Sequence, residues 1–139
     1  MLLCNADNGH TFPGACVPFG MIQVSPESGN GSWRYCSGFN IEDDSIMGFS
    51  QNHLNGTGCP DLGDILILPF CGDIQNEKYK SRYEKEHQKA HPGYYSVVLS
   101  DFGVEVELTA TQRTAMHRYT FRKAEPTHIL VDLQSGIVS

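Results

Sequence analysis

The chain has 139 residues, 40% of them apolar, and a net charge of −6, which suits one domain with its own hydrophobic core. Because the charge is acidic and no basic run occurs, the composition argues against a protein that neutralises nucleic-acid phosphates. No apolar run approaches the roughly 20 residues of a membrane span. The five cysteines form no CxxC pair, which disfavours a zinc knuckle; they are expected to be buried thiols or to include one disulfide.

The first 50 residues indicate short extended segments separated by turns. Three glycines and two prolines exclude a regular helix over residues 9–20. We expect a short strand at residues 20–25, a cluster of turns at 26–32, and a strand with a glycine kink at 33–40. Residues 46–50 are again expected to be extended.

The next segment, residues 48–64 (GFSQNHLNGTGCPDLGD), has too many small residues for a helix and too few apolar ones for a buried strand. Ordered loops of this kind on a rigid scaffold often carry binding sites. A turn-rich connection whose polar groups satisfy its own backbone explains the sequence about equally well. Its hydrogen-bonding side chains are His53, Asn55, Thr57, Asp61 and Asp64.

The remaining segments predict an all-β chain. Residues 65–70 (ILILPF) are a continuous apolar run of the length of a buried strand, and the charged residues 73–92 favour extended structure over a helix at 77–89. Apolar and polar residues then alternate in four successive segments, which predict an antiparallel sheet within a β-sandwich. These segments are residues 95–99, 104–110, 115–121 and 129–133.

The apolar end of the chain suggests that residues 1–139 are one domain of a longer protein, an amino-terminal β-sandwich truncated at its carboxy-terminal end. We expect the last strand to lie at a sheet edge or to pair with another chain.

Several groups of residues could in principle form a catalytic or metal site, but none matches a known motif well. Asp61 and Asp64, with Glu42, Asp43 and Asp44, could supply an acid and a base. The three-residue spacing of Asp61 and Asp64 permits the required distance, yet Asp near Gly is typical of turns. The spacing of His10, His53 and Asp61 matches no zinc or EF-hand pattern. A Ser-His-Asp catalytic site has no nucleophile elbow to support it. We therefore predict neither a catalytic residue nor a metal ligand in this chain.

Trp33 is the only tryptophan. It is either a core or edge aromatic, or a platform on which a sugar ring stacks, because an indole offers a flat apolar face and a polar N–H. Tyr35 is a weaker candidate for the same role.

Five blocks of the sequence together resemble the amino-terminal domain of the glycoside hydrolase family 92 α-mannosidases. They occur in the family's order and cover the chain nearly end to end. They are GHTFPGACVPFGMIQVSP, WRYCSGF, GFSQNHLNGTGCPDLGD, HPGYYSVVL and ELTATQRTAMHRYTF. One departure is that residues 3–8, LCNADN, stand where the family usually has a glycine-rich run.

The resemblance implies a calcium-dependent, inverting exo-α-mannosidase that removes terminal α-linked, in particular α-1,2-linked, mannose from glycans, including N-glycans. The sandwich would pair with a carboxy-terminal (α/α)6 domain that carries the general acid, the general base and most calcium ligands. Such enzymes are usually secreted, periplasmic or at the cell surface. Substrate contacts on this chain would come from Trp33, His10, Phe12, His53, Asn55, Thr57 and Asp61.

Two other functions remain open from the sequence. One is a stand-alone carbohydrate-binding β-sandwich that uses Trp33 and the loop at residues 48–64. The other is a purely structural or interaction domain, which would bury that loop by packing within the chain.

Overall fold

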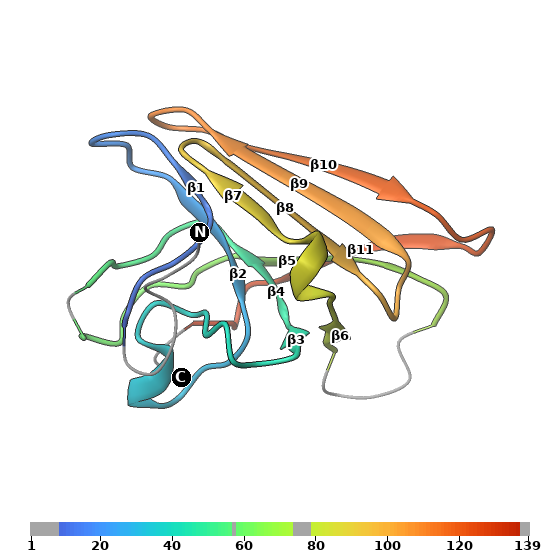
Figure 1. Cartoon of the computed structure of the whole chain (residues 1–139), viewed down its shortest axis with the longest axis horizontal. Helices are drawn as coiled ribbons and strands as arrows, with labels where there is room; N and C mark the ends of the chain where they lie inside the picture. Colours follow the sequence, from blue (N-terminus) through green and yellow to red (C-terminus); the bar gives the residue numbers. More distant parts are fainter. Residues whose placement is uncertain (1–8, 57, 74–78, 137–139) are drawn as a thin grey trace.

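The computed structural model describes residues 9–56, 58–73 and 79–136, and shows two antiparallel sheets packed face to face (Figure 1). The first sheet has the order β1 (Ala15–Cys16), β2 (Gln23–Glu27), β4 (Gly48–Ser50), β5 (Leu66–Cys71) and β11 (Thr127–Asp132). The second has the order β10 (Ala115–Phe121), β9 (Val104–Ala110), β8 (Tyr94–Leu99) and β7 (Lys89–His91). A short pair, β3 (Ser45–Ile46) with β6 (Ser81–Arg82), completes the strands of the described residues.

The core lies between the two sheets. Phe49 and Leu68 enter it from the first sheet, and Val97, Val106 and Leu108 enter it from the second. All five side chains are buried, which is the arrangement that alternating apolar residues produce when two sheets share an inner face. The described residues contain no α-helix, so the prediction of an all-β sandwich is confirmed. No helix in the described part of the chain could cross a membrane.

The β8–β9 hairpin and β10 lie where the alternation of apolar and polar residues predicted strands. In β8 and β9 the predicted inner residues are buried, and Asp101 to Gly103 form the turn between the two strands. The charged region that precedes them contains β6, a 3-10 turn at Lys85–His87 and β7, so the preference for extended structure over a helix is confirmed for residues 79–91.

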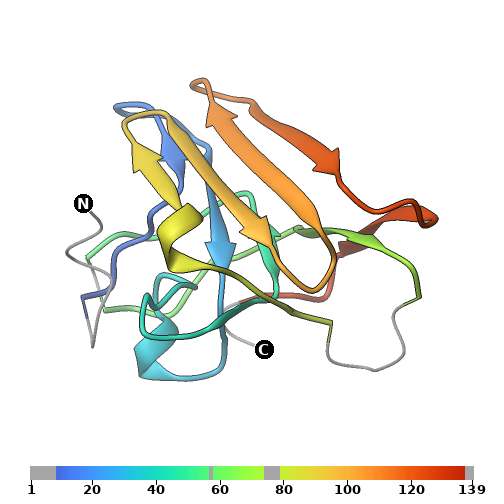
Figure 2. The same cartoon turned by 45° about the vertical axis from the view of Figure 1, so that its right-hand side comes forward.

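The fourth alternating segment does not join the sheet that contains β10. It forms β11, which pairs with β5 over six residues in the other sheet, and Figure 2 shows the chain leaving β10 and crossing to it. The apolar residues that mark this strand are exposed, whereas Leu130, between them, packs against the core. The prediction of one four-stranded sheet is therefore wrong, because alternation does not specify which strand edge a segment will pair with. In the described residues β11 pairs with β5 alone, so the expected edge position is confirmed.

The segment after β2 also differs from expectation. Residues 26 and 27 belong to β2 rather than to a turn, and Trp33–Tyr35 form a 3-10 turn instead of a strand. The Tyr35 N–H donates to the Ser32 carbonyl at 3.0 Å, and the Gly38 N–H donates to the Tyr35 carbonyl at 2.8 Å. Glycines on both sides allow this tight path, which a sequence of mixed aromatic and small residues also permits.

Candidate functional site

The glycine-rich loop after β4 is closed at its neck. His53 and Leu62 form an isolated antiparallel bridge, and the Gly63 N–H donates to the Asn52 carbonyl at 3.0 Å. The Asn52 side chain also donates to Asp64 Oδ2 at 3.0 Å and accepts from the Asp64 N–H at 2.9 Å. The polar residues of the neck therefore hold the loop in shape, and residues 54–56 and 58–61 form the described part of its tip.

Three distant segments meet beside this tip. The His10 Nε2–H donates to the Trp33 carbonyl at 2.9 Å, and the two rings meet edge to face with centroids 4.8 Å apart. The Gly56 N–H donates to the His10 carbonyl at 2.5 Å. The far edge of the Trp33 indole lies against Gly58, whose φ is +62°. The indole remains 58% exposed, so its position is fixed while much of its surface stays open.

Tyr35, the second aromatic candidate for stacking on a sugar, is not available at the surface in the same way. It is half-buried, and its ring lies directly against Gly29, where an added Cβ would stand 2.5 Å from the ring. Burial, together with the nearby Asp43 carboxylate, raises the pKa of Tyr35. Trp33 is therefore the aromatic that this turn presents to solvent.

Ion pairs and a thiol hydrogen bond stabilise the turn that carries Trp33. Arg34 forms ion pairs with Glu42 at 3.1 Å and with Asp43 at 3.2 Å. The Cys36 thiol donates to the Trp33 carbonyl at 3.0 Å, and burial raises the pKa of this thiol. These acidic residues therefore hold the turn, which is a structural role rather than a catalytic one.

Gly58 offers a direct test of this packing. An alanine there would place its Cβ 2.8 Å from the Trp33 ring, whereas an alanine at Gly56 would meet no atom within 4 Å. Both glycines have positive φ, so either substitution should cost about 1 kcal/mol of stability through backbone strain. We expect G58A alone to shift Trp33 fluorescence to longer wavelength and to raise its quenching by acrylamide. Equal spectra for G58A and G56A would contradict the contact.

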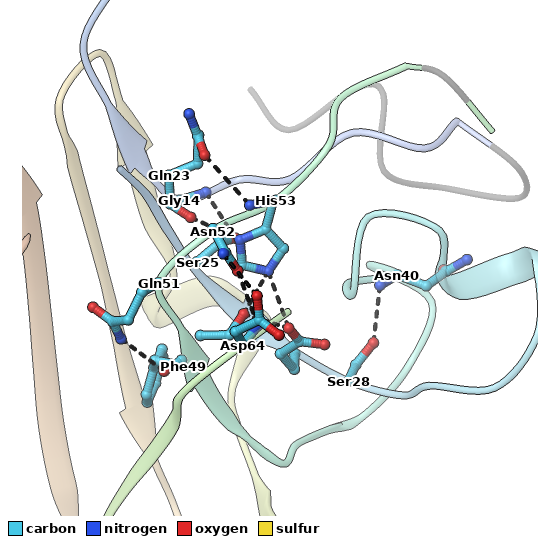
Figure 3. A network of polar contacts seen from close by, with 12 residues as sticks. Gly14, Gln23, Ser25, Ser28, Asn40, Phe49, Gln51, Asn52, His53 and Asp64 are labelled. Carbon is cyan, nitrogen blue, oxygen red and sulfur yellow. Dashed lines mark hydrogen bonds and ion pairs between the residues drawn. The ribbon is translucent and has the colours of Figure 1, made fainter. Parts of the chain in front are cut away.

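His53, in contrast, lies inside the molecule. Its ring centroid is 5.4 Å from that of Phe12, and its Nδ1–H donates to the Gln23 carbonyl at 2.7 Å. On the other side of the ring, Nε2 lies 2.9 Å from Ser50 Oγ and 3.1 Å from Glu27 Oε1. Figure 3 shows the ring held by contacts on both nitrogens. His53 therefore braces the base of the loop and does not face solvent.

The cluster of Ser50, His53 and Glu27 is not a catalytic triad. In a triad the acid and the nucleophile bind opposite ring nitrogens. Here Ser50 and Glu27 both contact Nε2, and a backbone carbonyl occupies Nδ1. All three side chains are buried, so no substrate carbonyl has access to the Ser50 hydroxyl.

The other residues singled out in the sequence have simpler positions. Asn55 and Asp61 are exposed in the loop, and Asp61 Oδ1 accepts from the Leu62 N–H at 2.8 Å, as in a turn. Thr57 lies outside the described residues. No group of three or more potential metal ligands occurs in the ranges that the structure describes. His10 and His53 do not act together, because His10 binds the Trp33 turn and His53 binds Glu27.

Glu27 and Ser50 could not be recognised from the sequence as parts of this arrangement. Glu27 stands between a proline and a run of small residues, which is typical of an exposed turn, yet it is 4% exposed. Its side-chain partners follow it by 23 and 26 residues. Contacts over such separations leave no local pattern in one sequence.

The described residues form a β-sandwich that presents an exposed indole beside a polar, glycine-rich loop. The profile of the glycosyl hydrolase family 92 N-terminal domain matches residues 1–139, and the chain belongs to this family.

Individual relatives support the assignment. An uncharacterized secreted glycosidase of Arthroderma benhamiae is 34% identical over 129 residues, which are 86% of this chain and 16% of that protein. A family GH92 α-mannosidase from Bacteroides thetaiotaomicron, solved in complex with mannoimidazole, superimposes with a TM-score of 0.93 at 36% identity, over 97% of this chain and 19% of that one. A GH92 inverting mannosidase from the same species gives a TM-score of 0.74 at 29% identity, over 88% of this chain and 17% of that one. The chain thus spans about a fifth or less of the length of these relatives.

Proposed function

We propose that this chain is the amino-terminal part of an exo-α-mannosidase and forms one wall of its sugar pocket. The observation that carries the proposal is the meeting of His10, Trp33 and Gly58, where three distant segments present an exposed indole next to a polar loop. Stacking on an indole suits the apolar face of a pyranose ring, and the exposed Asn55 and Asp61 side chains of the loop can bind hydroxyl groups. Phe12 packs against the buried His53 ring, which holds the base of the loop.

The acids that break the glycosidic bond would come from outside this chain. An inverting enzyme needs two carboxyl groups about 6.5–9.5 Å apart, with a water between the base and the sugar. In this region the Asp61 carboxylate accepts from the Leu62 N–H, and the Asp64 carboxylate accepts from the Asn52 side-chain amide. Glu27 is buried. Inversion is supported by the inverting mannosidase among the related structures. We place the general acid and base in a carboxy-terminal (α/α)6 domain.

Calcium dependence is part of the same proposal, but the described residues of this chain do not fit a calcium site. Calcium takes six to eight oxygen ligands, with carboxylates prominent among them. The described ranges contain no group of three or more potential ligands. The calcium ligands would therefore lie in the rest of the enzyme, and this chain would contact the sugar.

The substrate we propose is terminal α-linked mannose, with α-1,2-linked mannose of glycans, N-glycans included, as the preferred form. Export to the periplasm, cell surface or medium fits such a substrate and is supported by the secreted fungal relative. One surface suited to contact with the remaining domain is the loop at Phe19, whose side chain is fully exposed with φ of +59°. Exposed large apolar residues of this kind often mark interfaces.

The alternative is an independent carbohydrate-binding module, and one titration separates the two. Because Trp33 is the only tryptophan, its fluorescence reports directly on the proposed site. We expect methyl α-mannoside to change it only at millimolar concentration or above in the 139-residue chain, since half a pocket buries little of the sugar. Saturation in the micromolar range, absent with methyl α-galactoside, would instead favour the module.

A further inference from the structure

Glu27 is the only buried carboxylate among the described residues, and its side chain belongs to a residue that is 4% exposed. Its one ion-pair partner in the described part of the chain is His53. A carboxylate removed from water is costly unless hydrogen bonds replace its hydration. Oε1 accepts a short hydrogen bond from Ser50 Oγ and lies 3.1 Å from His53 Nε2. The carboxylate is therefore tied to the end of β4 and to the neck of the glycine-rich loop.

The same carboxylate also touches the turn that carries Trp33. A Cβ on Gly38 would stand 2.6 Å from Glu27 Oε2, so the carboxylate fills the space that a side chain at residue 38 would take. Gly38 closes the turn, because its carbonyl accepts from the Ser28 N–H at 2.8 Å and its N–H donates to the Tyr35 carbonyl. Glu27 thus lies between the closing residue of the Trp33 turn and the base of the loop.

We propose that Glu27 is a positioning residue that sets the Trp33 turn against the glycine-rich loop. It acts through Gly38 on one side and through His53 on the other, and does not itself reach the sugar. The effect of Glu27 on sugar binding rests on the proposed function above. Its effect on the position of Trp33 does not depend on that function. Without Glu27, the two hydrogen bonds of His10 would still join the Trp33 turn to the loop tip, but the base of the loop and Gly38 would lose their common contact and the indole would no longer be held against Gly58.

The test follows the contact between Trp33 and Gly58 by NMR in the 139-residue chain. In the wild type, a nuclear Overhauser effect is expected between the indole ring protons and the Gly58 α-protons, because the ring carbon Cη2 lies against Gly58. We expect E27A to lose this signal and E27Q to keep most of it, since the amide oxygen can still accept from Ser50 and His53. V104A, a buried truncation in β9, is the control for lost stability.

Should E27A fail to fold, S50A provides the same test, because it removes one of the two donors to Oε1 and leaves the carboxylate in place. A weakened signal in S50A, with V104A unchanged, would support the proposal. A signal of wild-type strength in E27A, or in S50A where E27A does not fold, would overturn it.

A second readout separates this proposal from the proposed function. In the longer enzyme, E27A should raise KM for an α-mannoside about tenfold if the competent arrangement falls to about a tenth of the molecules. Loss of the NMR contact without any effect on KM would retain Glu27 as a positioning residue and would count against Trp33 as a sugar contact. Unchanged NMR and unchanged KM would overturn the positioning role.

Discussion

F49A should lower the free energy of unfolding by about 3–5 kcal/mol, the largest effect on stability that we expect in this chain. Phe49 is fully buried in β4, opposite Pro26 of β2 and Ile67 of β5, so it holds the middle of the first sheet against the core. Removing the ring loses its burial and leaves a cavity that backbone paired on both sides cannot easily close. Urea denaturation followed by circular dichroism measures the change.

F19A is a matched control, because the same substitution removes a ring that is fully exposed. We expect a change within about 0.5 kcal/mol, as for most surface positions. Equal losses for the two variants would mean that the sandwich core is not where the structure places it. A small loss for F49A alone would contradict the role of β4 in joining β2 to β5.

W33A should lower kcat/KM of the proposed full-length enzyme for an α-mannoside by about 10- to 100-fold, each factor of ten being about 1.4 kcal/mol. The indole is exposed and held by His10 and Gly58, so its removal takes away a stacking surface without opening the core. The free energy of unfolding should change little. Initial rates of mannose release, measured over a range of substrate concentrations, give the comparison.

The control for W33A is M116A, which removes an exposed apolar side chain from β10 in the other sheet. It should leave kcat/KM unchanged. Wild-type kcat/KM in the W33A enzyme would show that Trp33 does not contribute to the sugar pocket. Loss of activity in both variants would indicate a general effect on the sandwich instead.

Much of the second sheet could be predicted from the sequence because its determinants are local. In β8 and β9 apolar and polar residues alternate, and the turn at Asp101 to Gly103 fixes their register. The same alternation in β11 indicates a strand but does not say which sheet it joins. That choice depends on the free edge of β5, which is formed by residues about 60 positions earlier.

The candidate site could be predicted only in part. The glycine-rich loop and Trp33 stand out in composition, and the structure brings His10, Trp33 and the loop tip together. Their part in sugar binding stays a prediction. The inward direction of His53 and the buried carboxylate of Glu27 could not be inferred, because both depend on contacts more than 20 residues apart in the chain.

The most direct test of the proposed function is hydrolysis of an aryl α-mannoside by the 139-residue chain and by the proposed longer protein, each with calcium present. We predict turnover by the longer protein, loss of most of it in W33A, and none by residues 1–139, since the acids that cleave the bond would lie elsewhere. Calcium-dependent hydrolysis by residues 1–139 alone would contradict the account, and so would a longer protein that leaves α-mannosides intact.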